Sequence, residues 1–133
     1  MTPSVRAIVE ACAHDSHAGK RNFGEIVMAL VGAGVESYYA DFRSATTTYY
    51  LPSGETIATP LPMPELQAAQ DFSADAMHAA VRGAQSGQVK YPEFLRLSLA
   101  AGCVGYMVWI AGRHVSYFGR RGETHVEHFP PAR

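Results

Sequence analysis

An internal repeat limits what this chain can fold into more than any other feature. Two short motifs, Ala-Gly and Gly-Glu-Thr, each recur 68 positions further along the chain. Aligned at this offset without a gap, residues 22–56 and 90–124 share eight identities, which include Tyr38 with Tyr106 and Tyr49 with Tyr117. Ungapped spacing and matching turn positions are typical of duplicated units. The sequence therefore predicts two copies of one structural unit.

Each copy is expected to form two helices followed by three strands. Apolar residues first recur with helical spacing; Asn22 and Glu25 are spaced as a capping box, and Ser73 suits an N-cap. Thr2 and Pro3 suit the start of the first helix. After each Ala-Gly motif the period changes to two, which is typical of strands. Strands are expected at 35–42, 46–51, 55–59, 103–111, 114–119 and 123–128.

This order predicts an α+β fold, an internally duplicated helix-helix-three-strand unit whose helices pack on one face of an antiparallel sheet. We expect a single domain over residues 1–133, with repeat halves at about 3–59 and 71–128. Three prolines make residues 60–64 a linker between the halves. With 47% hydrophobic residues, a chain of 133 residues can bury one core of its own.

Charge and composition give no reason to expect a nucleic-acid or membrane partner. Eleven basic and twelve acidic residues leave a formal net charge of −1, which does not attract nucleic acid or anionic lipid in general. The longest uncharged apolar stretch, 104–111, is too short to span a bilayer, and the N-terminus lacks the features of a secretion signal. We expect a cytoplasmic protein without a cofactor, in which Cys12 and Cys103 are reduced and buried.

One face of the predicted sheet mixes aromatic and polar side chains. A turn at Gly112-Arg113 pairs Ile110 with Val115 and directs both toward the core. Continuing this register across the next turn places His125 opposite Ser116 and Glu127 opposite His114. The predicted mixed face consists of Tyr39, Tyr50, Met107, Trp109, His114, Ser116, Phe118, His125 and Glu127. Exposed aromatic side chains beside convergent polar groups are typical of ligand pockets and interface hot spots.

Two functions and one structural alternative remain open for this face. In the first function, the chain is a non-enzymatic binding or interaction module whose partner is a second copy in a homodimer, another protein or a small apolar molecule. In the second, it is a small enzyme or metal-binding protein that uses His114, His125 and Glu127 as acid, base or metal ligands. In the structural alternative, the two halves fold over one another and the mixed face fills a second core. No nucleophile motif or phosphate loop is present, which favours a binding module.

Several segments resemble a known family. In the second half these are Tyr91-Pro92-Glu93-Phe94-Leu95, Ala100-Ala101-Gly102-Cys103-Val104-Gly105-Tyr106, Gly119-Arg120-Arg121-Gly122-Glu123 and His125-Val126-Glu127-His128-Phe129-Pro130. In the first half they are Gly34-Val35-Glu36-Ser37-Tyr38 and Thr48-Tyr49-Tyr50. Together they are similar to the YdfO-like family of small uncharacterised bacterial proteins, some of them labelled phage envelope protein. The resemblance implies a bacterial or prophage origin and a compact α+β fold, and it transfers no catalytic residue.

Overall fold

The computed structural model describes residues 4–129, in which two helices and three strands follow one another twice. The elements are α1 (Val5–His17), α2 (Phe23–Gly32), β1 (Ser37–Asp41), β2 (Thr46–Tyr50), β3 (Thr56–Pro60), α3 (Ala74–Gln85), α4 (Tyr91–Ala100), β4 (Cys103–Trp109), β5 (His114–Gly119) and β6 (Thr124–His128). The predicted α+β class and element order are confirmed. Among these residues, no helix has the length and apolarity needed to cross a lipid bilayer.

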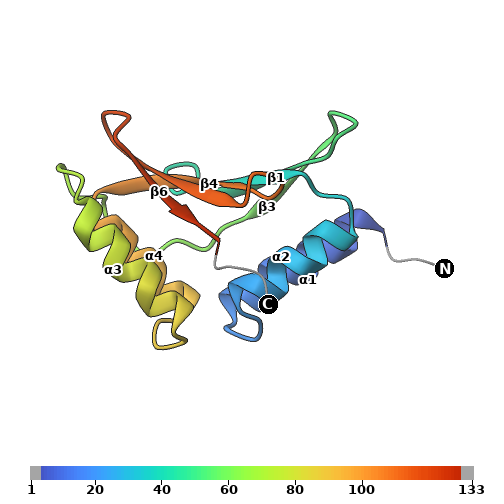
Figure 1. Cartoon of the computed structure of the whole chain (residues 1–133), viewed down its shortest axis with the longest axis horizontal. Coiled ribbons are helices and arrows are strands. Elements are labelled where there is room, and N and C mark those ends of the chain that lie inside the picture. The colour runs from blue at the N-terminus through green and yellow to red at the C-terminus, as the bar shows by residue number, and fades with distance from the viewer. Residues whose placement is uncertain (1–3, 130–133) are drawn as a thin grey trace.

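All six strands belong to one antiparallel sheet in the order β3-β2-β1-β4-β5-β6. The first strands of the two halves, β1 and β4, pair at its centre, where Tyr39 lies opposite Met107. Figure 1 shows all four helices on one face, with α1 and α2 beneath the β3 end and α3 and α4 beneath the β6 end. The alternative in which the halves fold over one another is therefore wrong, and no other element of residues 4–129 covers the second face of the sheet.

Helix starts follow the local sequence signals. Asn22 and Glu25 form the predicted capping box, in which each backbone N–H donates to the other side chain across 2.9 Å. The Ser73 Oγ accepts a hydrogen bond from Ala76 N at the start of α3. At the start of α1 the N-cap is Ser4, and the expected Thr2 and Pro3 lie outside the described residues.

The two halves also repeat one another in backbone conformation. Eight described residues have positive φ, and they form four pairs 68 positions apart: Gly19 with Gly87, Gly34 with Gly102, Ala45 with Arg113, and Gly54 with Gly122. These pairs end the first helix, the second helix, the first hairpin turn and the second hairpin turn of each half. The duplication itself stays a prediction, and the repeated conformation is what it requires.

The core lies between the helices and the sheet. Each helix contributes an apolar side chain with no exposed surface, Val9, Leu30, Met77 and Leu95 in chain order. Cys12 and Cys103 are free and buried in this core, as predicted. The helix-facing side of the sheet is built from alternate strand residues, so the faces follow directly from the strand register.

The pairing of β5 with β6 differs from the prediction by one residue. Tyr117 lies opposite His125 and Val115 opposite Glu127. The reason is the turn, in which Gly119 N donates to Glu123 O across 2.9 Å and Gly122 has a φ of +84°. A loop of three residues with a left-handed last residue replaces the two-residue loop that the prediction assumed. His125 and Glu127 consequently lie on the helix-covered face.

The pairing of β4 with β5 is also shifted, but by two residues. Val115 lies opposite Val108 instead of Ile110. The loop is longer because Arg113 takes a φ of +59° and its backbone N–H donates to Ile110 O. A shift of two residues leaves every side chain on its predicted face.

Candidate functional site

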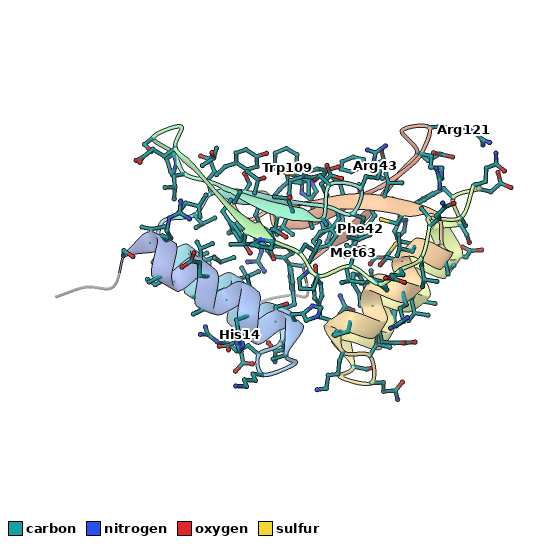
Figure 2. The ribbon with its side chains drawn as sticks, turned by 180° about the vertical axis from the view of Figure 1, so that it is seen from behind. His14, Phe42, Arg43, Met63, Trp109 and Arg121 are labelled. Carbon is teal, nitrogen blue, oxygen red and sulfur yellow. The ribbon has the colours of Figure 1, made fainter. Side chains whose placement is uncertain are left out.

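The open face of the sheet holds seven of the nine predicted site residues. They are Tyr39, Tyr50, Met107, Trp109, His114, Ser116 and Phe118. Trp109 is 41% exposed, donates from Nε1 to Ser116 Oγ across 3.2 Å, and lies on the side of the sheet away from the helices (Figure 2). A role of this face in binding stays a prediction.

The remaining two residues, His125 and Glu127, lie on the opposite face, so the set of His114, His125 and Glu127 is not assembled. The His114 ring instead faces His128, with 5.9 Å between the ring centroids. The partner of His125 and Glu127 is His78 of α3. His78 Nδ1 and His125 Nε2 each lie 2.6 Å from Glu127 Oε2. Burial raises the pKa of the Glu127 carboxyl, but the hydrogen bonds from His78 and His125 outweigh it and lower that pKa below its ordinary value.

A cavity of about 340 Å³ lies between the two helix pairs and the sheet. Both halves of the chain line it. Its walls come from α1, α2, α3 and α4, including Cys12, His17, Ile26, Val81, Ala84, Tyr91 and Phe94. The helix pairs lean toward one another, so that the α1–α2 and α3–α4 loops lie side by side below the sheet (Figure 1). The ring contact between His17 and Tyr91, with 6.4 Å between centroids, joins the pairs there.

Four tyrosines form the floor of this cavity, two from each half at equivalent positions. They are Tyr38, Tyr49, Tyr106 and Tyr117. Burial raises the pKa of each, to about 12 for Tyr49, so all four are neutral phenols at physiological pH. The Tyr106 hydroxyl pairs with that of Tyr91 across 2.7 Å. Within residues 4–129 the hydroxyls of Tyr38 and Tyr117 make no hydrogen bond, although both residues line the cavity.

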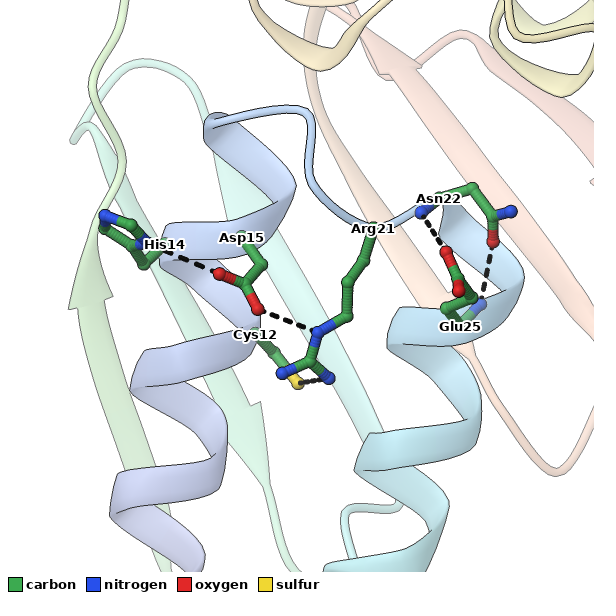
Figure 3. A network of polar contacts seen from close by, with 6 residues as sticks. All are labelled: Cys12, His14, Asp15, Arg21, Asn22 and Glu25. Carbon is green, nitrogen blue, oxygen red and sulfur yellow. Dashed lines mark hydrogen bonds and ion pairs between the residues drawn. The ribbon is translucent and has the colours of Figure 1, made fainter.

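The α1–α2 loop closes one end of the cavity and is held by a polar network (Figure 3). Arg21 Nε donates to Asp15 Oδ2 across 2.8 Å, and its Nη1 reaches Cys12 Sγ at 3.9 Å. The hydrogen bond from Arg21 lowers the pKa of the Asp15 carboxyl, so this pair is charged at neutral pH. The capping box of Asn22 and Glu25 then starts α2 directly after the loop. The cavity end is thus fixed by the same residues that set the helix boundaries.

Sequence reasoning did not find this cavity, although one signal for it was present. The repeat analysis identified Tyr38 with Tyr106 and Tyr49 with Tyr117 as identities. Large amphipathic side chains kept at equivalent strand positions of both copies converge where the copies meet. His78 gave no such signal, because its partners lie 47 and 49 positions away and depend on the turn before β6.

Residues 11–127 match the family described as protein of unknown function DUF1398. The chain belongs to the DUF1398 family. Its DUF1398 region contains all four floor tyrosines, His78, His125 and Glu127. Over 58 residues, 44% of this chain, it is 34% identical to the uncharacterized proteins Mb2035 of Mycobacterium bovis and Rv2012 of Mycobacterium tuberculosis. The matched part spans about a third of the length of these curated relatives, 35%. The YdfO-like label and the phage association stay predictions.

Proposed function

We propose that this protein is a binding module that takes a small, mainly apolar molecule into the cavity between its two helix pairs. The observation that carries the proposal is the 340 Å³ cavity lined by both halves. That volume lies at the small end of the range for ligand pockets, which suits a metabolite-sized molecule better than a peptide. An apolar wall with a few polar groups is the usual composition of such pockets.

The floor defines the chemistry of the ligand. Tyr38 and Tyr117 present neutral phenol hydroxyls that have no hydrogen-bond partner among the described residues. Both residues line the cavity, so a ligand acceptor that pairs with either hydroxyl adds a hydrogen bond and gains affinity. A phenol donates readily to a carbonyl or carboxylate oxygen. We expect an apolar ring or chain that carries one hydrogen-bond acceptor.

Native mass spectrometry of gently purified protein, compared with its denatured mass, tests for a retained ligand. The site itself is tested by titration with the amphipathic fluorescent probe 1-anilinonaphthalene-8-sulfonate, whose aromatic rings are apolar and whose sulfonate supplies hydrogen-bond acceptors. Ala84 of α3 lines the cavity, so Ala84→Phe should fill it and abolish probe binding. Ala79→Phe on the exposed side of the same helix is the matched control and should bind like wild type. Equal probe binding by Ala84→Phe and wild type would contradict the proposal.

The polar part of the proposal needs separate variants. Tyr38→Phe and Tyr117→Phe keep the ring and remove only the hydroxyl. For a retained ligand, each should weaken binding about two- to twelvefold, which corresponds to the usual 0.5–1.5 kcal/mol of one hydrogen bond. Tyr50→Phe, on the open face, should leave binding unchanged.

The open face supports a second candidate function, self-association into a homodimer. Trp109 and Val126 are 41% and 43% exposed on it, beside the aromatic rings of Tyr39 and Phe118. An exposed apolar sheet face is a common protein interface. If it joins two copies, Trp109→Ala should lower the dimer fraction in native mass spectra, while Met28→Ala on exposed α2 should not. A monomer at all concentrations tested would exclude this second function.

A further inference from the structure

His78, His125 and Glu127 converge from two elements onto one point at the edge of the sheet. His78 comes from α3, and the other two are alternate residues of β6 on the helix-facing side. One ligand atom from each of the three lies within 4.8 Å of the other two. The Glu127 side chain is only 14% exposed, and both imidazoles hydrogen-bond its Oε2 at 2.6 Å. A largely buried carboxylate is therefore already held between two imidazole nitrogens.

Two imidazoles and one carboxylate form a donor set typical of transition metals. Zinc sites with three protein ligands use this set and leave a further coordination position open. Mg²⁺ and Ca²⁺ prefer oxygen ligands throughout, so the two nitrogens select against them. Bonds of about 2.1 Å in tetrahedral geometry separate ligand atoms by roughly 3.4 Å. Each imidazole would have to withdraw from Glu127 by less than about 1 Å, and the His78 side chain, 46% exposed, has room to do so.

The first half of the chain shows that the fold does not require these residues. At the repeat offset of 68, the counterparts of His78, His125 and Glu127 are Glu10, Ile57 and Thr59. There α1 packs on β3 as α3 packs on β6. Ile57 and Thr59 are buried in that contact, while Glu10 is exposed. The equivalent packing is thus made without a histidine or a carboxylate between the helix and the strand.

We propose that His78, His125 and Glu127 bind a divalent transition-metal ion of the zinc class. Arg82 modulates this site. The Arg82 Nε donates to His78 Nε2 across 3.5 Å. If His78 binds the metal through Nδ1, its Nε2 carries the proton and can no longer accept this hydrogen bond. The positive charge of Arg82 also opposes a cation. Glu127 also lies at the cavity wall, so metal binding is tested by its own titration, separately from ligand binding in the cavity.

The test uses untagged, chelator-treated protein titrated with Co²⁺, followed by visible absorption, and with Zn²⁺, followed by calorimetry. Wild type should bind one equivalent and give the absorption bands of Co²⁺ bound by nitrogen and oxygen. His78→Ala and Glu127→Gln should weaken binding at least tenfold. The double variant His114→Ala/His128→Ala removes the histidine pair on the open face and should bind like wild type. Arg82→Gln should tighten binding severalfold.

A second double variant separates a metal site from a structural network. His125→Ile/Glu127→Thr installs the residues of the first half, so it should fold with wild-type stability and lose the metal. The proposal is overturned if wild type binds no stoichiometric Co²⁺ up to 1 mM, or if His78→Ala binds as wild type does. It is also overturned if the variant His114→Ala/His128→Ala loses Co²⁺ binding.

Discussion

Gly34 and Gly102 offer a matched pair in which the cost of a steric clash can be measured alone. Both follow the second helix of their half and have a φ of +87°. A Cβ on Gly34 would meet no atom within 4 Å, whereas a Cβ on Gly102 would overlap the backbone carbonyl oxygen of Asp71 and lie 2.8 Å from Phe72 Cα. Replacement by alanine therefore imposes the same backbone penalty at both sites and a clash at only one.

The magnitude follows from these two contributions. Left-handed backbone costs alanine about 1–2 kcal/mol, and the lower entropy of the unfolded chain returns about 0.4–1 kcal/mol. Gly34→Ala should therefore lower the free energy of unfolding by about 1 kcal/mol. At Gly102 the segment 69–73, which contains Asp71, cannot easily move away. Two backbone hydrogen bonds hold it, from Ser73 N to Ala101 O and from Ala69 N to Leu99 O, each across 2.8 Å. Overpacking against fixed backbone adds about 1–3 kcal/mol.

Urea unfolding at 25 °C, followed by circular dichroism and by Trp109 fluorescence, measures both changes. Unfolding midpoints should fall in both variants, with Gly102→Ala the lower and with unchanged dependence on urea concentration. Equal losses would mean that residues 71–72 move aside at no cost, and a larger loss in Gly34→Ala would refute the assignment of the clash.

Three further predictions concern the core, the thiols and the tyrosines. Leu95→Ala should lower the free energy of unfolding by about 2–5 kcal/mol in the same assay because Leu95 has no exposed surface, while Val31→Ala, 52% exposed, should stay within about 0.5 kcal/mol. Burial raises the pKa of the Cys103 thiol to about 11, so iodoacetamide at pH 8 should label it only after unfolding, and labelling of the folded protein at that site would contradict its burial. Burial raises the pKa of Tyr49 to about 12 and raises that of Tyr106 well above its ordinary value. The stability that these neutral phenols contribute is therefore complete below about pH 10 and is lost as the pH rises, at about 1.4 kcal/mol per pH unit for each. The rise in absorbance at 295 nm that accompanies tyrosine ionisation should therefore occur at the same pH as unfolding. Ionisation of these tyrosines near pH 10 in the folded protein would show that they are exposed.

The elements of this fold could be predicted because their signals are local. The capping box at Asn22 and the glycines at 34 and 102 mark helix ends within a few residues of chain. The single sheet was also within reach, since duplicated three-strand units can join through their first strands. The cavity could not be predicted, because it depends on the angle between the two helix pairs, and no local sequence pattern determines that angle.

The cluster of His78, His125 and Glu127 shows how the conformation of one turn decides which side chains lie on the same face of the sheet. A two-residue loop at Arg120-Arg121 would place His125 and Glu127 on the same face as His114. A glycine at the third loop position signals the alternative, a three-residue loop that ends in left-handed conformation. Gly54 takes this role in the first half, with a φ of +93° and a hydrogen bond from Leu51 N to Glu55 O. Applied to Gly122, the same rule moves both side chains under α3, where His78 is the nearest histidine.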